Sequence, residues 1–306
     1  MQRYEMRDLG ELQWFLNINV VRDRNQRKIS LSQEAYIDKI VKRYHLEHAP
    51  KANTPLSLPR REFVKNDGVK ATPQETHAYQ QRIGSCIYPA VTTRPDIAHA
   101  ASLLAQFLQN PSPRHRAEAD RLICYLRDSK HLAIEYSGTA TTQIFEAACD
   151  AAYADDKETR RSSEGWIFKF FGGPVDWKAA RQTTVTTSTT EAELLALSHA
   201  GSALIWWKRF FNQLDFQLGP DNEPLTILCD NSMTVNHIMA EKPKLNTKLQ
   251  HIDIRHHWLR ERVHQMKDLT IQWVPTAEMP ADGLTKPLQP GPHRDFLHQI
   301  GLKNLK

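Results

Sequence analysis

The sequence predicts an α/β fold in which a mixed five-stranded sheet with helices on its faces is preceded by a smaller, mainly helical α+β segment. Two observations support this prediction. From residue 143 onward, apolar stretches of strand length alternate with stretches of helical periodicity. Three strand patterns come first, and helices then alternate with the remaining strands, which fits a mixed sheet covered by helices.

The first half combines a short hairpin with helices. Residues 49–77 contain several prolines and few apolar residues, so we expect a loop or linker there. Two later helical patterns begin at Pro95 and Pro113, because proline is favoured in the first turn of a helix. Strands are expected at 11–22 and 27–32 around a polar turn, and helices at 33–46, 95–109 and 113–128.

The second half alternates strands and helices. We place the domain boundary near 137–141, which gives domains 1–137 and 138–306. Strands are expected at 143–150, 164–171, 174–187, 224–229 and 269–274. Helices are expected at 188–213, 231–240, 249–266 and 278–286.

Composition bounds the class of protein. A chain of 306 residues is long enough for two cores, and its 40% hydrophobic and 25% charged residues are ordinary for a globular protein. It contains no apolar run of membrane-spanning length, and its polar start predicts that it is not secreted. The scattered cysteines favour a reducing compartment over disulfides or zinc. They are Cys86, Cys124, Cys149 and Cys229.

Four acidic motifs in the second half each place one carboxylate where an expected element begins or ends. Hydrolysis of a phosphodiester uses two hard cations about 4 Å apart, and such cations take oxygen ligands. The motifs therefore predict a site for two Mg²⁺ ions, with Mn²⁺ as a substitute. The candidate catalytic and metal-binding residues are Asp150 in AACDAAYAD, Glu193 in STTEAELLALSHA, Asp230 in ILCDNSMTVNHI and Asp282 in WVPTAEMPADGLTK.

The order Asp, Glu, Asp, Asp, together with its flanks, resembles ribonuclease H. The segments SEGWIFKFFGGPVDWKAARQ, HIDIRHHWLRERV and DGLTKPL resemble the ribonuclease H domain of copia-type LTR retrotransposon Pol polyproteins. In the first half, MRDLGELQWFLNINV, ISLSQEAYIDKIVKRYHLE and YQQRIGSCIYPAVTTRPDIAHAASLLAQFLQNPS resemble the end of the reverse transcriptase of the same elements. The resemblance covers nearly the whole chain, in order.

This resemblance implies a ribonuclease H-like fold in 138–306 and a reverse transcriptase thumb and connection in 1–137. It implies an endonuclease that cleaves the RNA strand of RNA–DNA hybrids by two-metal hydrolysis. The partners implied are the hybrid and the upstream polymerase part, in a cytoplasmic virus-like particle or the nucleus. A different hypothesis is a catalytically silent remnant that at most binds nucleic acid.

Two of the four acids have competing interpretations. In STTEAE, Ser188 is a favoured N-cap and Glu191 completes a capping box, so Glu193 is our choice of ligand and Glu191 is the alternative. Asp230 opens an expected helix, where an N-cap role is also favourable.

The remaining candidates concern nucleic acid and histidine. Polar side chains at the end of the third strand predict phosphate contacts, with solvated side chains as the alternative; they are the basic residues Lys178 and Arg181 and the neutral Gln182. The histidines near His251 and Asp253 have the spacing of an amphipathic helix, and the role of those two residues is not assigned. The loop 275–281 lacks the histidine that cellular ribonucleases H usually carry.

The sequence Tyr153-Ala154-Asp155-Asp156 mimics a polymerase motif, but it follows the thumb-like segment. The resemblance places the catalytic aspartates of the polymerase upstream of residues 6–20, and DNA polymerase activity is therefore not expected from this fragment alone.

Overall fold

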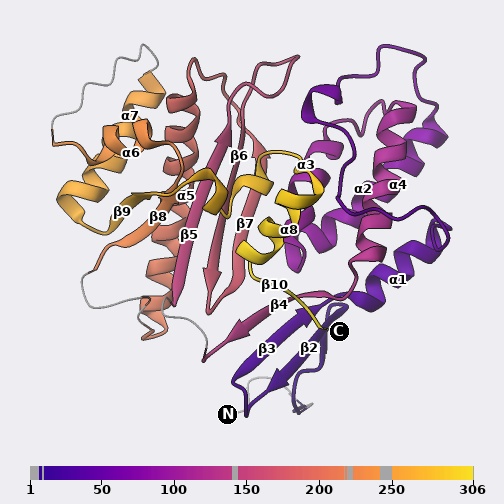
Figure 1. Cartoon of the computed structure of the whole chain (residues 1–306), viewed down its shortest axis with the longest axis horizontal. Helices are drawn as coiled ribbons and strands as arrows, with labels where there is room; N and C mark the ends of the chain where they lie inside the picture. Colours follow the sequence, from indigo (N-terminus) through magenta and orange to yellow (C-terminus); the bar gives the residue numbers. More distant parts are fainter. Residues whose placement is uncertain are drawn as a thin grey trace.

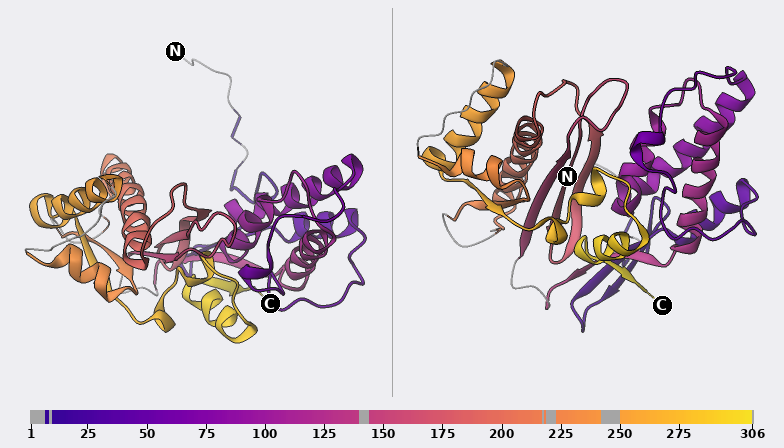
Figure 2. Two further views of the ribbon diagram at one scale, coloured as in Figure 1. Left: turned by 90° about the horizontal axis from the view of Figure 1, so that it is seen from above. Right: turned by 45° about the horizontal axis from the view of Figure 1, so that its top comes forward.

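Two five-stranded sheets organise the chain (Figure 1). The computed structural model describes residues 7–8, 10–139, 144–216, 218, 223–241 and 250–305. Both views of Figure 2 show the second sheet between helices α5, α6 and α7 on one side and helices α2, α3 and α4 on the other. Among the helices of the described ranges, none has the length and apolar character that crossing a membrane requires.

The first sheet is antiparallel and has the strand order β1-β2-β3-β4-β10. The expected hairpin is present as β2 and β3, where Asn19 pairs with Ser32 and Asp23 with Lys28. The last strand, β10, returns from the chain end to pair with β4. The strands are β1 (Trp14–Phe15), β2 (Ile18–Asp23), β3 (Lys28–Ser32), β4 (Leu132–Ser137) and β10 (Leu302–Asn304).

Helices pack beside this first sheet around one apolar cluster. The helices expected at 33–46 and 113–128 are confirmed, whereas the one expected at 95–109 is a 3-10 turn, η2, followed by a shorter helix. The elements are α1 (Glu34–Arg43), η1 (Arg60–Glu62), α2 (Pro73–Thr92), η2 (Pro95–Ile97), α3 (Ala98–Ala105) and α4 (Pro113–Asp128).

The loop expected over 49–77 is present over 49–72, apart from the short turn η1, but its last five residues belong to a helix. Helix α2 already begins at Pro73, and Thr72 forms a capping box with Glu75. Upstream of it the loop is packed at some positions and exposed at others: Leu56 and Phe63 are 5% and 3% exposed and belong to the apolar cluster, whereas residues 67–70 are exposed.

The second sheet has the order β7-β6-β5-β8-β9. Strands β5, β6 and β7 pair antiparallel, whereas β8 pairs parallel with both β5 and β9. This mixed five-stranded sheet confirms the expected ribonuclease H-like fold class. The third strand ends at Arg181 instead of 187. The strands are β5 (Phe145–Ala152), β6 (Ser163–Phe170), β7 (Gly173–Arg181), β8 (Leu225–Cys229) and β9 (Leu269–Trp273).

Three of the four helices expected beside this sheet are present, and α8 is an additional helix that was not expected. The segment 278–286 is not a helix, because Pro280 forces Met279 into an extended conformation with a ψ of 107°. Two 3-10 turns, η4 and η5, lie there. The elements are α5 (Thr189–Gln213), α6 (Ser232–Met239), α7 (Gln250–Arg260) with the π-helical turn η3 (Glu261–Met266), η4 (Thr276–Glu278), η5 (Asp282–Leu284) and α8 (Pro290–Gln299).

The two faces of the second sheet have different cores. Cys149 and Trp166 pack with α5, whereas Ala148 and Ile167 face η5 and α8. The second of these cores also contains Ile134 of β4 and side chains of α3 and β10, so both halves of the chain share it. The boundary at 137/138 remains a prediction, and residues of α8 and β10 contact both proposed domains.

A buried ion pair lies at this shared core. Arg94 donates two hydrogen bonds to Asp96, at 2.8 and 2.7 Å, and the two residues are 1% and 3% exposed. Tyr125 donates to Asp96 at 2.6 Å, and its hydroxyl lies 2.8 Å from His293 of α8. The pair therefore joins η2 to α4 and α8 through buried groups.

We predict that Asp96→Asn lowers the free energy of unfolding by about 3–5 kcal/mol, because it leaves the buried Arg94 charge uncompensated. Urea denaturation of the full chain measures the loss. Asp120→Asn is the matched control: the Arg82–Asp120 pair is partly exposed, so its loss should cost less than about 1 kcal/mol. Equal losses in the two variants would contradict the structural role of Asp96.

Candidate metal centre

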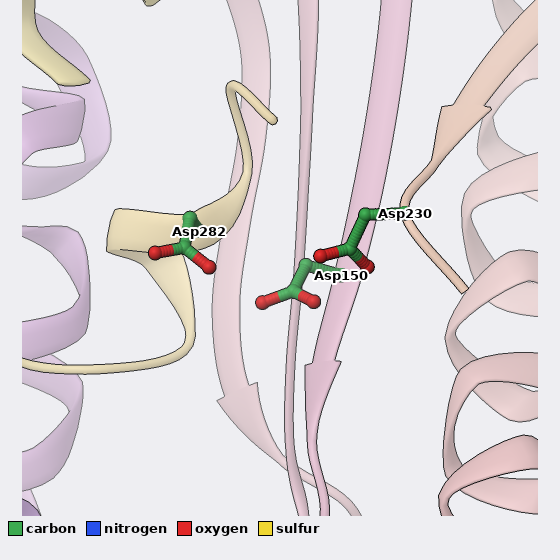
Figure 3. Close-up of side chains that lie close together, drawn as sticks. All are labelled: Asp150, Asp230 and Asp282. Carbon is green, nitrogen blue, oxygen red and sulfur yellow. The ribbon is translucent and has the colours of Figure 1, made fainter. Parts of the chain in front are cut away.

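Three aspartates from distant parts of the sequence meet near the carboxyl ends of the central strand β5 and its neighbour β8 in the second sheet (Figure 3). Asp150 lies in β5, Asp230 directly follows β8, and Asp282 begins η5. One carboxylate oxygen from each lies within 4.8 Å of the others. Oxygen ligands at this spacing are the kind that hard divalent cations prefer.

Parallel strand pairing brings the first two aspartates together. Ala147 pairs with Ile227, and Ala148 pairs with Leu228. Continuing this register places Asp150 level with Asp230 at the carboxyl ends of β5 and β8. Cys149 is fully buried in the core beneath α5, on the face opposite to Ala148, as the alternation of side chains along a strand predicts.

Two glycines allow the turn that carries Asp282 to lie against the sheet. Gly165 pairs with Asp150 in the ladder, and a Cβ atom on Gly165 would lie 2.6 Å from Cβ of Leu284 in η5. A Cβ on Gly283 would lie 2.6 Å from the Phe296 ring. The close approach of η5 therefore depends on the absence of both side chains.

Glu193 is not one of the three residues whose oxygens converge, but it lies close enough to Asp150 and Asp230 that their charges act on it. It is 5% exposed, and the backbone N–H of Ala151 donates to its carboxylate. Its Oε2 atom has no hydrogen-bond partner within the described ranges. Burial raises the pKa of Glu193 to about 9, with a further contribution from the charges of Asp150 and Asp230. A buried carboxylate without a proton or cation is unstable here, so the site fits a positively charged ligand.

The neighbouring Glu191 is already used in capping α5. Its Oε2 accepts hydrogen bonds from the backbone and the hydroxyl of Thr187, both at 2.7 Å. Ser188 is the N-cap, as predicted, and accepts from the N–H of Glu191 at 3.2 Å. A capping box would have the N–H of Ser188 donate to Glu191, but Thr187, one residue earlier, is the donor instead. Because the carboxylate of Glu191 is occupied in this way, the geometry favours Glu193 as the ligand.

Asp230 does not cap the helix that follows it. The N-cap of α6 is Asn231, whose side chain accepts from the N–H of Thr234. Asp230 Oδ2 accepts instead from the hydroxyl of Thr276 at 2.7 Å, and its carbonyl accepts from the Trp273 indole. Its carboxylate is therefore oriented by β9 and the following loop.

The electrostatics of the cluster combine burial with mutual repulsion. Burial raises the pKa of Asp150 to about 6; Lys286 and the Thr285 hydroxyl oppose the increase, and Asp230 and Asp282 add to it. Burial also raises the pKa of Asp282, whose carboxylate contacts the Lys286 ammonium. The cluster therefore carries more negative charge than its surroundings neutralise, as expected of a site for divalent cations.

The sequence reasoning did not single out the side chains that support the acids. Thr285 donates to Asp150, Thr276 donates to Asp230, and Lys286 contacts Asp282. Asp282 and Lys286 are four positions apart in DGLTK, and this spacing could have predicted the contact between their side chains.

The residues expected to contact nucleic acid differ in exposure. The Lys178 side chain is 43% exposed, lies 4.5 Å above the Trp166 ring and approaches Glu164 at 3.4 Å. Arg181 is partly exposed and pairs with Asp156 at 2.6 Å. Gln182 is 2% exposed, and its amide donates to the carbonyl of Ala192. Gln182 is therefore a buried structural residue in this structure, because β7 ends where α5 covers it.

The histidines and the polymerase-like motif do not form a second centre in the described structure. The His251 side chain lies outside the described residues, and Asp253 lies 3.5 Å from the exposed His257. Asp155 accepts two hydrogen bonds from Ser163. Asp156, like Asp155, pairs with Arg60 of the first half. These two carboxylates join the halves of the chain.

Comparisons with known proteins identify sequence relatives of this chain. No protein-family model matches the chain. The Retrovirus-related Pol polyprotein from transposon TNT 1-94 of Nicotiana tabacum is 34% identical over 286 residues, or 92% of this chain and 21% of that polyprotein. The Pol polyprotein from transposon RE1 of Arabidopsis thaliana is 31% identical over 301 residues, or 98% of this chain and 20% of that polyprotein. The chain belongs to the copia-type retrotransposon Pol family.

This copia-type Pol chain spans about a fifth of the length of those two relatives. Among solved structures, LC11-RNase H1 in complex with an RNA/DNA hybrid is 14% identical, with a TM-score of 0.35; the match covers 46% of this chain and 93% of that one. The fold class follows from the strand order of the Pol chain itself.

We predict that Gly165→Ala destabilises the protein by about 1–3 kcal/mol, because a new Cβ collides with Leu284 and displaces η5. Thermal and urea unfolding measure the change. Gly84→Ala in α2 is the control: its Cβ would meet nothing within 4 Å, so helix propensity should make that variant up to about 1 kcal/mol more stable. A harmless Gly165→Ala would contradict the packing described for η5.

We also predict that Asp150→Asn stabilises the metal-free protein by about 1–3 kcal/mol at pH 8. The raised pKa of Asp150 means that its ionised form is unfavourable in the folded state, so stability falls as pH rises above the unfolded pKa. Urea denaturation in EDTA measures this gain. The exposed Asp38→Asn, which only weakens a contact with Lys130, should not reproduce it. A destabilised Asp150→Asn protein would argue against repulsion in the cluster.

Proposed function

We propose that this Pol chain is a ribonuclease H that cleaves the RNA strand of RNA–DNA hybrids with two Mg²⁺ ions, which Mn²⁺ can replace. The convergence of Asp150, Asp230 and Asp282 is the observation that carries the proposal, and the charges of Asp150 and Asp230 also act on the buried Glu193. These four side chains would hold the ions. When bound, the ions would supply an activated water and stabilise the departing oxygen.

The protein groups around the cluster prepare it for this reaction. Thr276 and Thr285 fix the orientation of Asp230 and Asp150 by donating hydrogen bonds. The Ala151 N–H fixes one oxygen of Glu193 and leaves the other available. Oriented carboxylates need little rearrangement when a ligand arrives, and such preorganisation favours binding and catalysis.

The hybrid would lie across the carboxyl ends of β5 and β8, next to basic side chains. Lys178 is the exposed candidate for a phosphate contact, and Arg181 would have to loosen its pair with Asp156 to make one. Discrimination of RNA from DNA would come from 2′-hydroxyl contacts in the wide minor groove of the hybrid. The first half would extend the binding surface and join the upstream polymerase part, in a cytoplasmic virus-like particle or the nucleus.

Cleavage of a labelled RNA–DNA hybrid in Mg²⁺ tests the proposal. Glu193→Gln should reduce the rate at least about a hundredfold, because loss of a metal ligand costs at least as much as loss of a residue that supports one. Glu191→Gln is the matched control, since Gln can still accept from Thr187 and the rate should stay within about tenfold.

The opposite order of the two glutamate variants would show that Glu191 is the ligand. Wild-type protein that binds the hybrid but leaves it intact at every Mg²⁺ and Mn²⁺ concentration would favour the alternative, a catalytically silent retrotransposon segment that binds nucleic acid. Duplex DNA of the same sequence is the substrate control, and it should remain uncut.

A further inference from the structure

Lys286 places a positive charge inside the proposed metal centre. Its ammonium contacts Oδ1 of Asp282, four residues earlier in the chain. It is also close enough to Asp150 and Asp230 that their charges interact with it. Part of the negative charge that a metal ion would neutralise is thus already matched by a cation of the protein.

The backbone that carries Lys286 is held in place. Thr285, its neighbour, donates to Asp150, and the N–H of Lys286 lies 3.3 Å from the carbonyl of Asp282. Below the turn, Leu284 packs against Gly165 of β6. The segment from Asp282 to Lys286 therefore acts as one unit that brings a ligand, a hydroxyl donor and an ammonium group to the cluster.

We propose that Lys286 is a tethered counter-cation for Asp282, and that it must release Asp282 before a second divalent ion binds. This inference rests on the proposed function, because it assumes that the four carboxylates hold two ions. The first ion would bind tightly through Asp150 and Asp230, whose carboxylates are not paired with the ammonium group. The second ion would bind more weakly, because it competes with the ammonium group for Asp282.

The size of the effect follows from the charges. Like charges separated by ~4 Å in a partly buried site repel enough to change an equilibrium constant by more than about tenfold. Lys286 would therefore make the affinity for the second ion lower than the affinity for the first. It would thereby set the metal concentration at which both sites are occupied. In the metal-free protein the same charge would lessen the repulsion among the carboxylates, making Lys286 a positioning residue.

Calorimetric titration of the full chain with Mn²⁺ tests this proposal. The wild type should bind two ions, the second at least about tenfold more weakly than the first. Lys286→Gln should tighten the second event about tenfold or more, whereas Lys286→Arg keeps the charge and should resemble the wild type. Lys65→Gln is the control, since Lys65 is 78% exposed and pairs with Glu158 on the surface.

A second measurement does not depend on metal. In EDTA, Lys286→Gln should lower the melting temperature, and Lys286→Arg should restore it. An unchanged second Mn²⁺ affinity in Lys286→Gln, or an unchanged melting temperature, would overturn the role of Lys286 while leaving the metal centre intact. Wild-type protein that binds no Mn²⁺ would instead refute the metal centre itself, and this inference with it.

Discussion

Repulsion among buried carboxylates is the constraint on which the rest of the second half depends. Asp150, Glu193, Asp230 and Asp282 come from four separate elements and would drive one another apart without support. The fold opposes this repulsion with specific donors: the hydroxyls of Thr276 and Thr285, the N–H of Ala151 and the ammonium of Lys286. Oriented but incompletely neutralised carboxylates are poised for a divalent cation, so the instability of the site is also the basis of the proposed function.

The supporting elements are held by packing that extends into the first half of the chain. Turn η5 packs against Gly165 of β6 and against Phe296 of α8. His293 of α8 contacts Tyr125, which in turn donates a hydrogen bond to Asp96 of the buried Arg94–Asp96 pair. Strand β10 then joins the sheet of the first half. A destabilising substitution in the first half can therefore disturb the acidic cluster even at a residue that contacts no ligand. The reason is that the two halves of the chain share one apolar core.

Local pattern predicted elements well where periodicity was strong and poorly where proline was frequent. The strands of the second sheet and the long helix α5 agree with expectation to within a few residues, apart from the end of β7. The start of helix α2 was missed although Thr72 and Glu75 form a capping box, because the prolines and the few apolar residues of 49–77 suggested a loop. A helix at 278–286 was expected, but Pro280 breaks it and leaves two 3-10 turns. Proline restricts the backbone but does not determine which side chains are buried. The burial of Leu56 and Phe63 depends on contacts with residues that are distant in sequence.

The sequence alone determined the order of the four acids, the type of sheet and the family resemblance, because these depend on local periodicity and on motifs a few residues long. It also indicated the capping function of Glu191, which involves neighbouring residues only. Tertiary structure alone decided which side chains face the cluster. It buried Gln182, gave the N-cap of α6 to Asn231 rather than Asp230, and placed Lys286 against Asp282. Those outcomes depend on strand register and on the close approach of η5 to Gly165, which bring together residues that are up to half the chain apart.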